Sequence, residues 1–441
     1  MNLKFCRLTS SVLLLAVFGS VGAQDVVTVP YEPDSGNLTI RCGILIDGIA
    51  DQPRTFQTVE IVDGRVRAVG HSDKDPDLDL TLYTCMPGLI DTHTHIADLA
   101  STADLSVYYT VTDAVLADVS RRNAEITLAA GFTTARNVGA YIGWSGRDLR
   151  DAIKRGEIAG PRMQIAGFYL TIPGGGGDLV IPGHDESEIP ARIRLGVARG
   201  PDAFRQKAQD AIDGGADFLK IIASGAVLAY GGVPGAPEMT RDEIKAVVDV
   251  AHAAGRKVTA HAHGAQSMKD AILAGVDSIE HASLADDEAI RLAVEHGVAF
   301  SMDVYNGDFI ATVGREEGWP EEFIRKNDET TEAQRQVFTR AHEAGVIITY
   351  GTDSGVYPHG DNAKQFVVMV QRGMTPMEAI KSATSVAAKS IGWERDVGTL
   401  EPGHLGDLVA VRGDVLSNVS LLQDVDVVVK GGLLFKYQDS E

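Results

Sequence analysis

A lysine stands in the middle of an apolar run that the sequence predicts as a buried strand. Residues 217–223 have the sequence DFLKIIA, in which the lysine is Lys220. A bare ammonium there would cost several kcal/mol even after relaxation, so lysine is rarely buried without a partner. Burial favours the neutral amine, which can add CO2 to give an anionic carbamate able to bridge two cations. A lysine that snorkels from a strand end and a Schiff-base lysine are the alternatives.

Histidines and an aspartate end other apolar runs. His93 and His95 are two residues apart, so on a strand both side chains point to the same side, where two imidazoles can hold one metal ion. A single histidine at a strand end is more often a hydrogen-bonded core residue. Several histidines and an aspartate at successive strand ends, together with a buried lysine, predict a metal centre. The further candidates are His261, with His263 two residues on, His281 and Asp353.

Eight short apolar runs alternate with helical patterns through the middle of the chain. Many helical patterns end in an Ala-Gly or His-Gly pair, and glycine after a helix is the expected left-handed stop. This alternation predicts an α/β fold, a (β/α)8 TIM-type barrel with catalytic groups at the carboxyl ends of its strands. An open doubly wound sheet is the alternative, weakened because no GxGxxG motif follows the first strand. The expected strands are 88–93, 133–138, 163–168, 218–223, 257–261, 278–281, 299–304 and 347–352.

The two ends of the chain are β-rich. Asp63 and Gly64 stand between two strand-like runs and give a strong hairpin signal, and similar runs recur after residue 397. We therefore expect residues 24–86 and 393–441 to form a small β-sandwich domain. The barrel would then occupy residues 87–392.

Residues 171–196 interrupt the alternation with four consecutive glycines and, further on, Pro182, Gly183 and His184. A loop after the third strand of a barrel lies on the catalytic face. Long loops of this kind are usually lids or binding elements, and a disordered insert is the alternative. We expect this loop to determine specificity and His184 to contact the substrate.

Composition and the start of the chain limit the partners and the compartment. The 441 residues carry a net charge of −21, which argues against nucleic acid or an anionic membrane as a partner. Residues 1–23 have a basic start, a short apolar core and a small-residue end, as a secretory signal peptide has; an uncleaved anchor is the alternative. A secreted or periplasmic protein is therefore expected. Cys42 and Cys85 could pair in an oxidising compartment, and two reduced, buried cysteines fit equally well.

The order of these residues resembles the amidohydrolase superfamily, and within it the imidazolonepropionase-like Xaa-Pro dipeptidase group. The motifs that carry the resemblance are the HxH pair, GFTTAR at 131–136, HAHG at 261–264, SIEH at 278–281 and GTLEPGHLGDLV at 398–409. The sequence departs from relatives at 224–227, where SGAV lacks a second glycine. Lys220 argues against the mononuclear deaminase branch, and the resemblance implies a homo-oligomer such as an octamer.

The resemblance also implies roles for the site residues. Two divalent metal ions, expected to be Zn2+, would be bridged by Lys220 after its carboxylation by CO2. A hydroxide shared by the metals would attack an amide carbonyl, since metals lower the pKa of water toward about 7, and Asp353 would pass its proton to the leaving amine. His263 would either hydrogen-bond the substrate carbonyl or oxyanion or orient a neighbouring side chain. Tyr230 would reach the substrate carboxylate, and a surface tyrosine is the alternative. The ligands would be His93, His95 and Asp353 for one metal, and His261 and His281 for the other.

The expected reaction is hydrolysis of a peptide-like amide in a small molecule, either a dipeptide or an N-acyl amino acid, with release of the C-terminal amino acid. Ochratoxin A fits this class, because its phenylalanine is amide-linked to an aromatic acid. A cyclic-amide or lactone hydrolase would use the same metals with a different pocket. A binding protein without metal and a Schiff-base aldolase are further alternatives.

Overall fold

The computed structural model describes residues 36–99 and 101–438. The expected signal peptide, residues 1–23, lies outside the described residues, as does the expected β domain up to residue 35. None of the helices in the described ranges combines the length and the apolarity that a membrane crossing requires.

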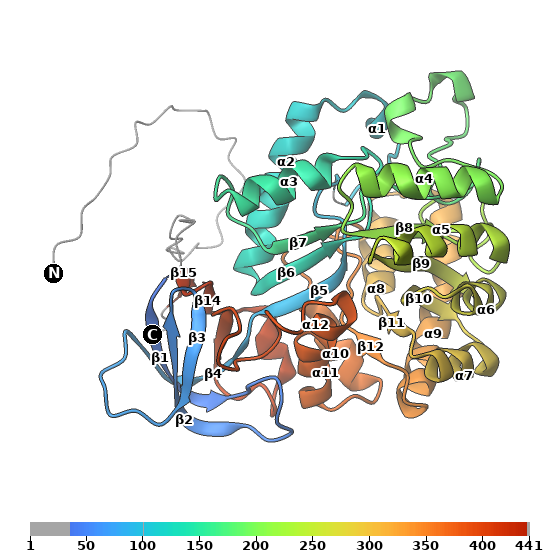
Figure 1. Ribbon diagram of the computed structural model, residues 1–441. Coiled ribbons are helices and arrows are strands. Elements are labelled where there is room, and N and C mark those ends of the chain that lie inside the picture. The colour runs from blue at the N-terminus through green and yellow to red at the C-terminus, as the bar shows by residue number, and fades with distance from the viewer. Residues whose placement is uncertain (1–35, 100, 439–441) are drawn as a thin grey trace.

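Within the described residues, eight parallel strands belong to two sheets, and they lie at the centre of the larger body (Figure 1). Three of them make a sheet in the order β5-β6-β7, and five make another in the order β12-β11-β10-β9-β8. Parallel bridges join Leu170 to Ile221 and Thr94 to Ser354, so the two sheets close into a ring. The expected (β/α)8 barrel is confirmed. Its strands are β5 (Leu89–Thr94), β6 (Phe132–Asn137), β7 (Arg162–Ile165), β8 (Phe218–Ile222), β9 (Lys257–Gly264), β10 (Ser278–Leu284), β11 (Ala299–Ser301) and β12 (Ile348–Thr349).

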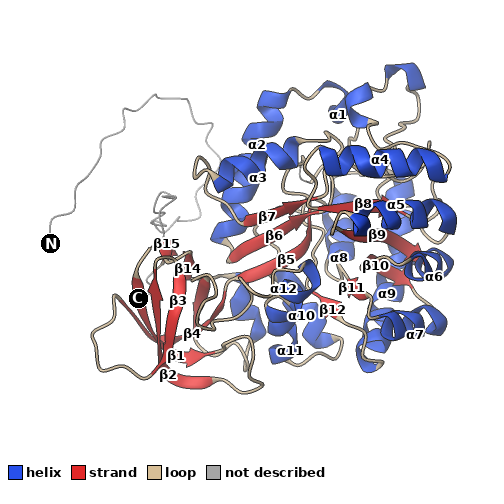
Figure 2. Ribbon diagram, in the orientation of Figure 1, coloured by secondary structure: helices blue, strands red, loops and turns tan. Residues whose placement is uncertain are grey.

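Helices surround the barrel strands (Figure 2). Local chemistry sets their ends: Thr240 and Glu243 form a capping box at the start of α5, and Gly275 ends α6 with a φ of 99°. Val247 on α5 and Leu219 on β8 belong to one buried cluster, so the helices pack their apolar faces on the strands. The helices are α1 (Val107–Thr110), α2 (Asp113–Ala129), α3 (Ser145–Lys154), α4 (Pro201–Asp213), α5 (Arg241–Ala253), α6 (Ala265–Ala274), α7 (Asp287–His296), α8 (Asn306–Phe309), α9 (Glu321–Glu343), α10 (Lys364–Gln371), α11 (Pro376–Ser382) and α12 (Ser385–Ile391).

Strands from the two ends of the chain share one seven-stranded sheet in the order β15-β14-β13-β4-β1-β2-β3. Asp63 and Gly64 form the turn of the expected β2–β3 hairpin. Strands β3 and β14 lie near opposite ends of this order, yet Val66 on β3 and Val427 on β14 belong to the same buried cluster. The sheet is therefore curled so that its two ends pack face to face, as in a β-sandwich. The strands are β1 (Leu38–Leu45), β2 (Arg54–Val62), β3 (Arg65–Gly70), β4 (Leu78–Pro87), β13 (Leu408–Arg412), β14 (Val427–Lys430) and β15 (Leu433–Tyr437).

Cys42 and Cys85 form a disulfide between β1 and β4. Both side chains are fully buried in the cluster of the β sheet. The sequence left open whether these cysteines pair, and the structure resolves it in favour of the bond.

The loop expected over residues 171–196 is folded against the barrel. Its buried leucine and isoleucine side chains cluster with Tyr108 on α1 and Phe323 on α9. The Tyr109 hydroxyl donates a hydrogen bond to the Leu179 carbonyl over 2.7 Å. Within the loop are two single 3-10 turns, η1 (Glu186–Glu188) and η2 (Ala191–Ile193). The loop is therefore packed in place by contacts from separate segments.

Candidate metal centre

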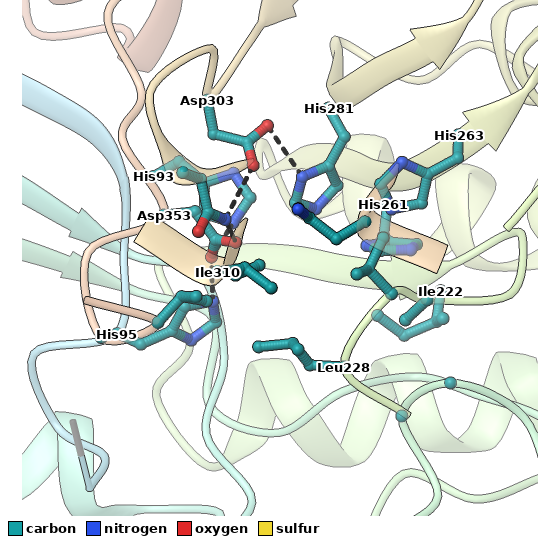
Figure 3. Close-up of a pocket in the computed structure, with 18 of the residues that line it drawn as sticks. His93, His95, Ile222, Leu228, His261, His263, His281, Asp303, Ile310 and Asp353 are labelled. Carbon is teal, nitrogen blue, oxygen red and sulfur yellow. Dashed lines mark hydrogen bonds and ion pairs between the residues drawn. The ribbon is translucent and has the colours of Figure 1, made fainter. Parts of the chain in front are cut away.

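The carboxyl ends of the barrel strands bring the expected site residues around one cavity (Figure 3). Parallel barrel strands all end on the same face, so side chains at these ends converge. In chain order these residues are His93 on β5, His95 directly after it, Lys220 on β8, His261 and His263 on β9, His281 on β10 and Asp353 after β12. All six expected metal ligands and the expected catalytic histidine line this cavity.

Asp353 and two histidines form the first group of donors. Asp353 Oδ1 lies 3.2 Å from His93 Nε2 and 3.1 Å from His95 Nε2. Burial opposes ionisation of the carboxyl, but the charge of His93 and the hydrogen bonds from both histidines hold the pKa of Asp353 well below its usual range. Two imidazoles and a carboxylate in this arrangement can hold a divalent metal ion.

Three histidines form the second group. The ring centroids of His261 and His281 are 4.5 Å apart, and His263 lies 4.7 Å from each of them. Burial is the main cause that lowers the pKa of His261 well below its usual value, and the neighbouring imidazoles lower it further. Burial also lowers the pKa of His263 to about 3. Both rings are therefore neutral near pH 7, and neutral imidazole is the form that binds metals.

Asp303 links the two groups, and the sequence analysis did not single it out. Asp303 Oδ1 lies 3.0 Å from His281 Nδ1 and accepts a hydrogen bond from Gln334 Nε2 over 2.7 Å. Asn306 Nδ2 donates to Asp303 Oδ2 over 3.0 Å and to Asp353 Oδ2 over 2.9 Å. Asp303 is the penultimate residue of the run 299–304 and stands two residues after β11 ends, so a search for donors just after barrel strands would also have found it.

Lys220 lines the same cavity and is 2% exposed. Its Nζ makes no hydrogen bond and no ion pair with any described residue. Burial lowers the pKa of Lys220 to about 8, although the charges of Glu280 and Asp353 oppose the shift. At this pKa about a tenth of the amine would be neutral at pH 7. An unpartnered amine beside two groups of nitrogen and oxygen donors is compatible with a binuclear metal site.

A buried carboxylate supports His93 from behind. Glu280 Oε2 lies 2.8 Å from His93 Nδ1, and Glu280 Oε1 accepts a hydrogen bond from Arg136 over 2.5 Å and another from Thr259. Burial opposes ionisation of Glu280, but Arg136 and His93 hold its pKa well below the usual range. A carboxylate on the second ring nitrogen fixes the orientation of a metal-binding histidine. Sequence reasoning missed this contact, because it joins strands that are far apart in the chain.

Backbone strain gathers at the donors. Three non-glycine residues at or beside the donors have positive φ: 71° at His281, 52° at Ala282 and 57° at Asp353. Each such conformation costs of order 1–3 kcal/mol and persists only where the surroundings enforce it. The strain lies at the two donors that Asp303 and Asn306 contact, so these polar contacts hold the side chains in their aimed positions.

The remaining cavity wall is mostly apolar and aromatic. Ile222, Leu228 and Ile310 face the donors (Figure 3). Of the three expected substrate contacts, His263 lines the cavity and the other two lie outside the lining residues. Tyr230 packs on Phe323 with 4.8 Å between ring centroids, and His184 is half-exposed and pairs with Glu188 over 3.1 Å. Ile310 begins a π-helical turn over residues 310–314, a feature frequent at functional sites.

The chain is similar to proteins of known family over most of its length. The model of the amidohydrolase family matches residues 84–434. An ochratoxinase of Aspergillus niger is 30% identical over 456 residues, which cover 95% of this chain and 90% of the relative. These matches cover the barrel strands and the residues that line the cavity, so they agree with the geometry of the site.

Two solved structures resemble the fold closely. A Xaa-Pro dipeptidase with methionine bound in its active site superposes with a TM-score of 0.84 at 36% identity, covering 91% of this chain and 100% of that one. The crystal structure of the A. niger ochratoxinase superposes with a TM-score of 0.80 at 29% identity, covering 92% and 96%.

Proposed function

This chain belongs to the amidohydrolase family, and we propose that it hydrolyses peptide-like amides of small molecules with release of a C-terminal amino acid. Dipeptides and N-acyl amino acids are the proposed substrate class, with ochratoxin A among the latter. The single observation that carries the proposal is Lys220, a buried amine without a partner in the cavity that both donor groups line. The names of an ochratoxinase and a Xaa-Pro dipeptidase among similar proteins support the substrate class.

The donor set fits two divalent metal ions, and we propose Zn2+. Lys220 as a carbamate would contribute an oxygen to each ion. Bound ions would polarise a substrate carbonyl and lower the pKa of water toward about 7. The proposed ligands are His93, His95 and Asp353 for one ion and His261 and His281 for the other.

Asp353 is the group that we propose to move the proton. Its Oδ1 faces two histidines, while its Oδ2 accepts a hydrogen bond from Asn306. A carboxylate held in this way can take a proton from the attacking water and deliver it to the nitrogen of the leaving amine. The neighbouring histidines keep the pKa of Asp353 low, so the carboxylate is the form present before the reaction.

His263 is proposed to stabilise the amide oxygen. Ser283 Oγ lies 2.8 Å from His263 Nδ1, which leaves Nε2 available toward the cavity. A hydroxyl that donates to Nδ1 selects the tautomer with a proton on Nε2, and that N–H can donate to the carbonyl oxygen as charge develops on it. Because the pKa of His263 is about 3, the ring acts as a neutral donor.

We also propose that the protein is exported and forms a homo-oligomer such as an octamer. The buried Cys42–Cys85 disulfide supports export, because disulfides persist in oxidising compartments. Light scattering on the purified protein measures its oligomeric state. Amino-terminal sequencing of the exported form tests cleavage after residue 23.

Metal analysis combined with a substrate screen tests the proposed function. The purified protein is expected to contain two divalent ions per chain and to release amino acids from dipeptides and N-acyl amino acids. Lys220→Ala should lose metal and activity together. A protein that cleaves only lactones or cyclic amides would support the alternative reaction on the same donors.

Lys326→Ala provides a matched control for the loss of a buried lysine. Lys326 is 1% exposed, and its ammonium donates to the Ala229 carbonyl over 2.6 Å and pairs with Glu322. Its replacement should destabilise the fold without removing metal. Equal loss of metal in both variants would show that unfolding causes the effect and would overturn the bridging role of Lys220.

A further inference from the structure

Asp98 is a second buried group of the cavity with an incomplete set of partners. Its side chain is 4% exposed, and its Oδ1 has no hydrogen-bond partner among the described residues. Its Oδ2 lies 3.9 Å from His95 Nδ1, which is beyond hydrogen-bond reach. That nitrogen instead faces the Tyr169 hydroxyl at 3.2 Å and the Gly139 carbonyl at 3.3 Å. Asp98 therefore has no orienting contact with His95.

The backbone of Asp98 is anchored at the cavity wall. Asn123 Nδ2 donates to the Asp98 carbonyl over 3.1 Å and to the Ile96 carbonyl over 3.0 Å. Asp98 itself lines the cavity, so its unpartnered carboxyl oxygen is available to a ligand there.

Three tyrosines that line the cavity surround Asp98. The ring centroids of Tyr108 and Tyr141 are 4.9 Å apart, and those of Tyr141 and Tyr169 are 5.2 Å apart. The Tyr108 hydroxyl accepts a hydrogen bond over 3.2 Å from the backbone N–H of Leu99, the residue after Asp98. The Tyr169 hydroxyl lies 3.2 Å from His95 Nδ1, which is itself 3.9 Å from Asp98 Oδ2. Aromatic faces attract cations through the ring quadrupole, so a carboxyl among aromatic rings is a surrounding suited to an ammonium group.

Among the described residues, Asp98 forms no ion pair with a lysine or an arginine, and His95 at 3.9 Å is its ion-pair neighbour. Among the described lining residues, Lys220 is the only lysine and no arginine is present. A positive charge within about 4–6 Å stabilises a buried carboxylate, so a cationic ligand at the unpartnered Oδ1 would complete the group.

We propose that Asp98 and the three tyrosines bind the ammonium group on the acyl half of the substrate. The inference rests on the proposed amide hydrolysis and narrows its substrates to dipeptides with a free amino terminus, ahead of N-acyl amino acids. The α-ammonium of a dipeptide is attached to the carbon next to the reacting carbonyl, and Asp98 stands next to the donor His95. Ochratoxin A, whose acyl half has no ammonium, would leave this subsite unfilled.

Kinetics with two substrates of matched shape test the inference. L-leucyl-L-proline carries the ammonium, and 4-methylpentanoyl-L-proline has the same skeleton without it. The wild-type enzyme should prefer the dipeptide in kcat/KM, and Asp98→Asn should reduce this preference about 10- to 100-fold, the range for one hydrogen bond to a charged group. A preference that changes less than threefold in Asp98→Asn would overturn the inference.

Asp104→Asn is the matched control. Asp104 is an exposed carboxylate in the segment that follows Asp98, and its side chain contacts Ser106 outside the lining of the cavity. Removal of this charge should leave the substrate preference at the wild-type value. An equal change in both variants would attribute the effect to net charge and would overturn the role of Asp98.

Binding separates this inference from the proposed hydrolysis. Calorimetry compares 3-methylbutylamine with 3-methylbutanol, which share a skeleton and are not hydrolysed. The amine should bind the wild-type protein at least tenfold more tightly, and Asp98→Asn should remove the difference. If the substrate screen finds no hydrolysis at all, the hydrolysis proposal fails while this comparison still decides the subsite. Equal binding of amine and alcohol to the wild-type protein would overturn it.

Discussion

Replacement of Glu280 by glutamine should weaken the fold and the metal site together. The carboxylate lies 2.5 Å from the Arg136 guanidinium and 2.8 Å from His93 Nδ1. The side chains of Arg136, Glu280 and His93 are 2%, 0% and 1% exposed, so water screens none of these contacts. Removal of one partner from a buried ion pair costs about 3–5 kcal/mol of the free energy of unfolding. Loss of a carboxylate behind a metal-binding histidine lowers metal affinity about 10- to 100-fold.

Two measurements separate these effects. Urea unfolding of the metal-free proteins gives the change in the free energy of unfolding, and zinc titration against a competing chelator gives the change in affinity. Glu243→Gln is the control, because Glu243 is also buried but caps α5 at Thr240 and accepts from the Gly200 backbone N–H. This control should cost about 1 kcal/mol, as a lost helix cap does, and should leave zinc affinity unchanged.

Two outcomes would contradict this role of Glu280. If Glu280→Gln binds zinc as tightly as the wild-type protein while folded, the carboxylate does not orient His93. If the variant is no less stable than Glu243→Gln, the charge of Arg136 does not depend on Glu280 for compensation.

Other parts of the structure give further predictions. Burial lowers the pKa of His359 to about 3, so between pH about 6.5 and 3 the unfolded chain binds a proton that the folded chain does not. Acidification through this window should cost up to about 5 kcal/mol, and urea unfolding of His359→Gln should show a weaker pH dependence. Replacing Cys42 and Cys85 by alanine should cost about 4 kcal/mol in thermal unfolding for a separation of 43 residues, without change in zinc affinity. Tyr109→Phe removes the hydrogen bond to Leu179 and should raise KM several-fold more than it lowers kcat in steady-state assays.

The strands and most of the donors follow from short-range patterns. Barrel strands are buried on both faces, so they give continuous apolar runs, and β8 and β10 coincide with the runs at 218–223 and 278–281. A donor that ends such a run must lie at the carboxyl face. Asp303 shows that donors also occur outside the recognised motifs, because it follows β11 by two residues without a neighbouring histidine in the sequence.

Contacts between distant strands cannot be read from these patterns. The Arg136–Glu280 pair spans 144 positions in the chain, and alternation of apolar and polar residues carries no information about which strands meet. Tyr230 and His184 lie in loops whose course depends on packing. The sequence around Tyr230 and His184 therefore does not determine where their side chains point.

Lys220 and Asp98 present the same physical problem, but only one of them is visible in the sequence. Both are ionisable, buried at the cavity wall and short of partners. Lys220 stands in a predictable strand, so its burial can be inferred, whereas Asp98 stands in a loop that usually lies at the surface. A folded chain tolerates such groups when a ligand completes them, since an uncompensated buried charge costs several kcal/mol. On this argument CO2 and metal complete Lys220 and the substrate completes Asp98, so the metal-free, ligand-free protein should be stabilised by zinc and 3-methylbutylamine independently.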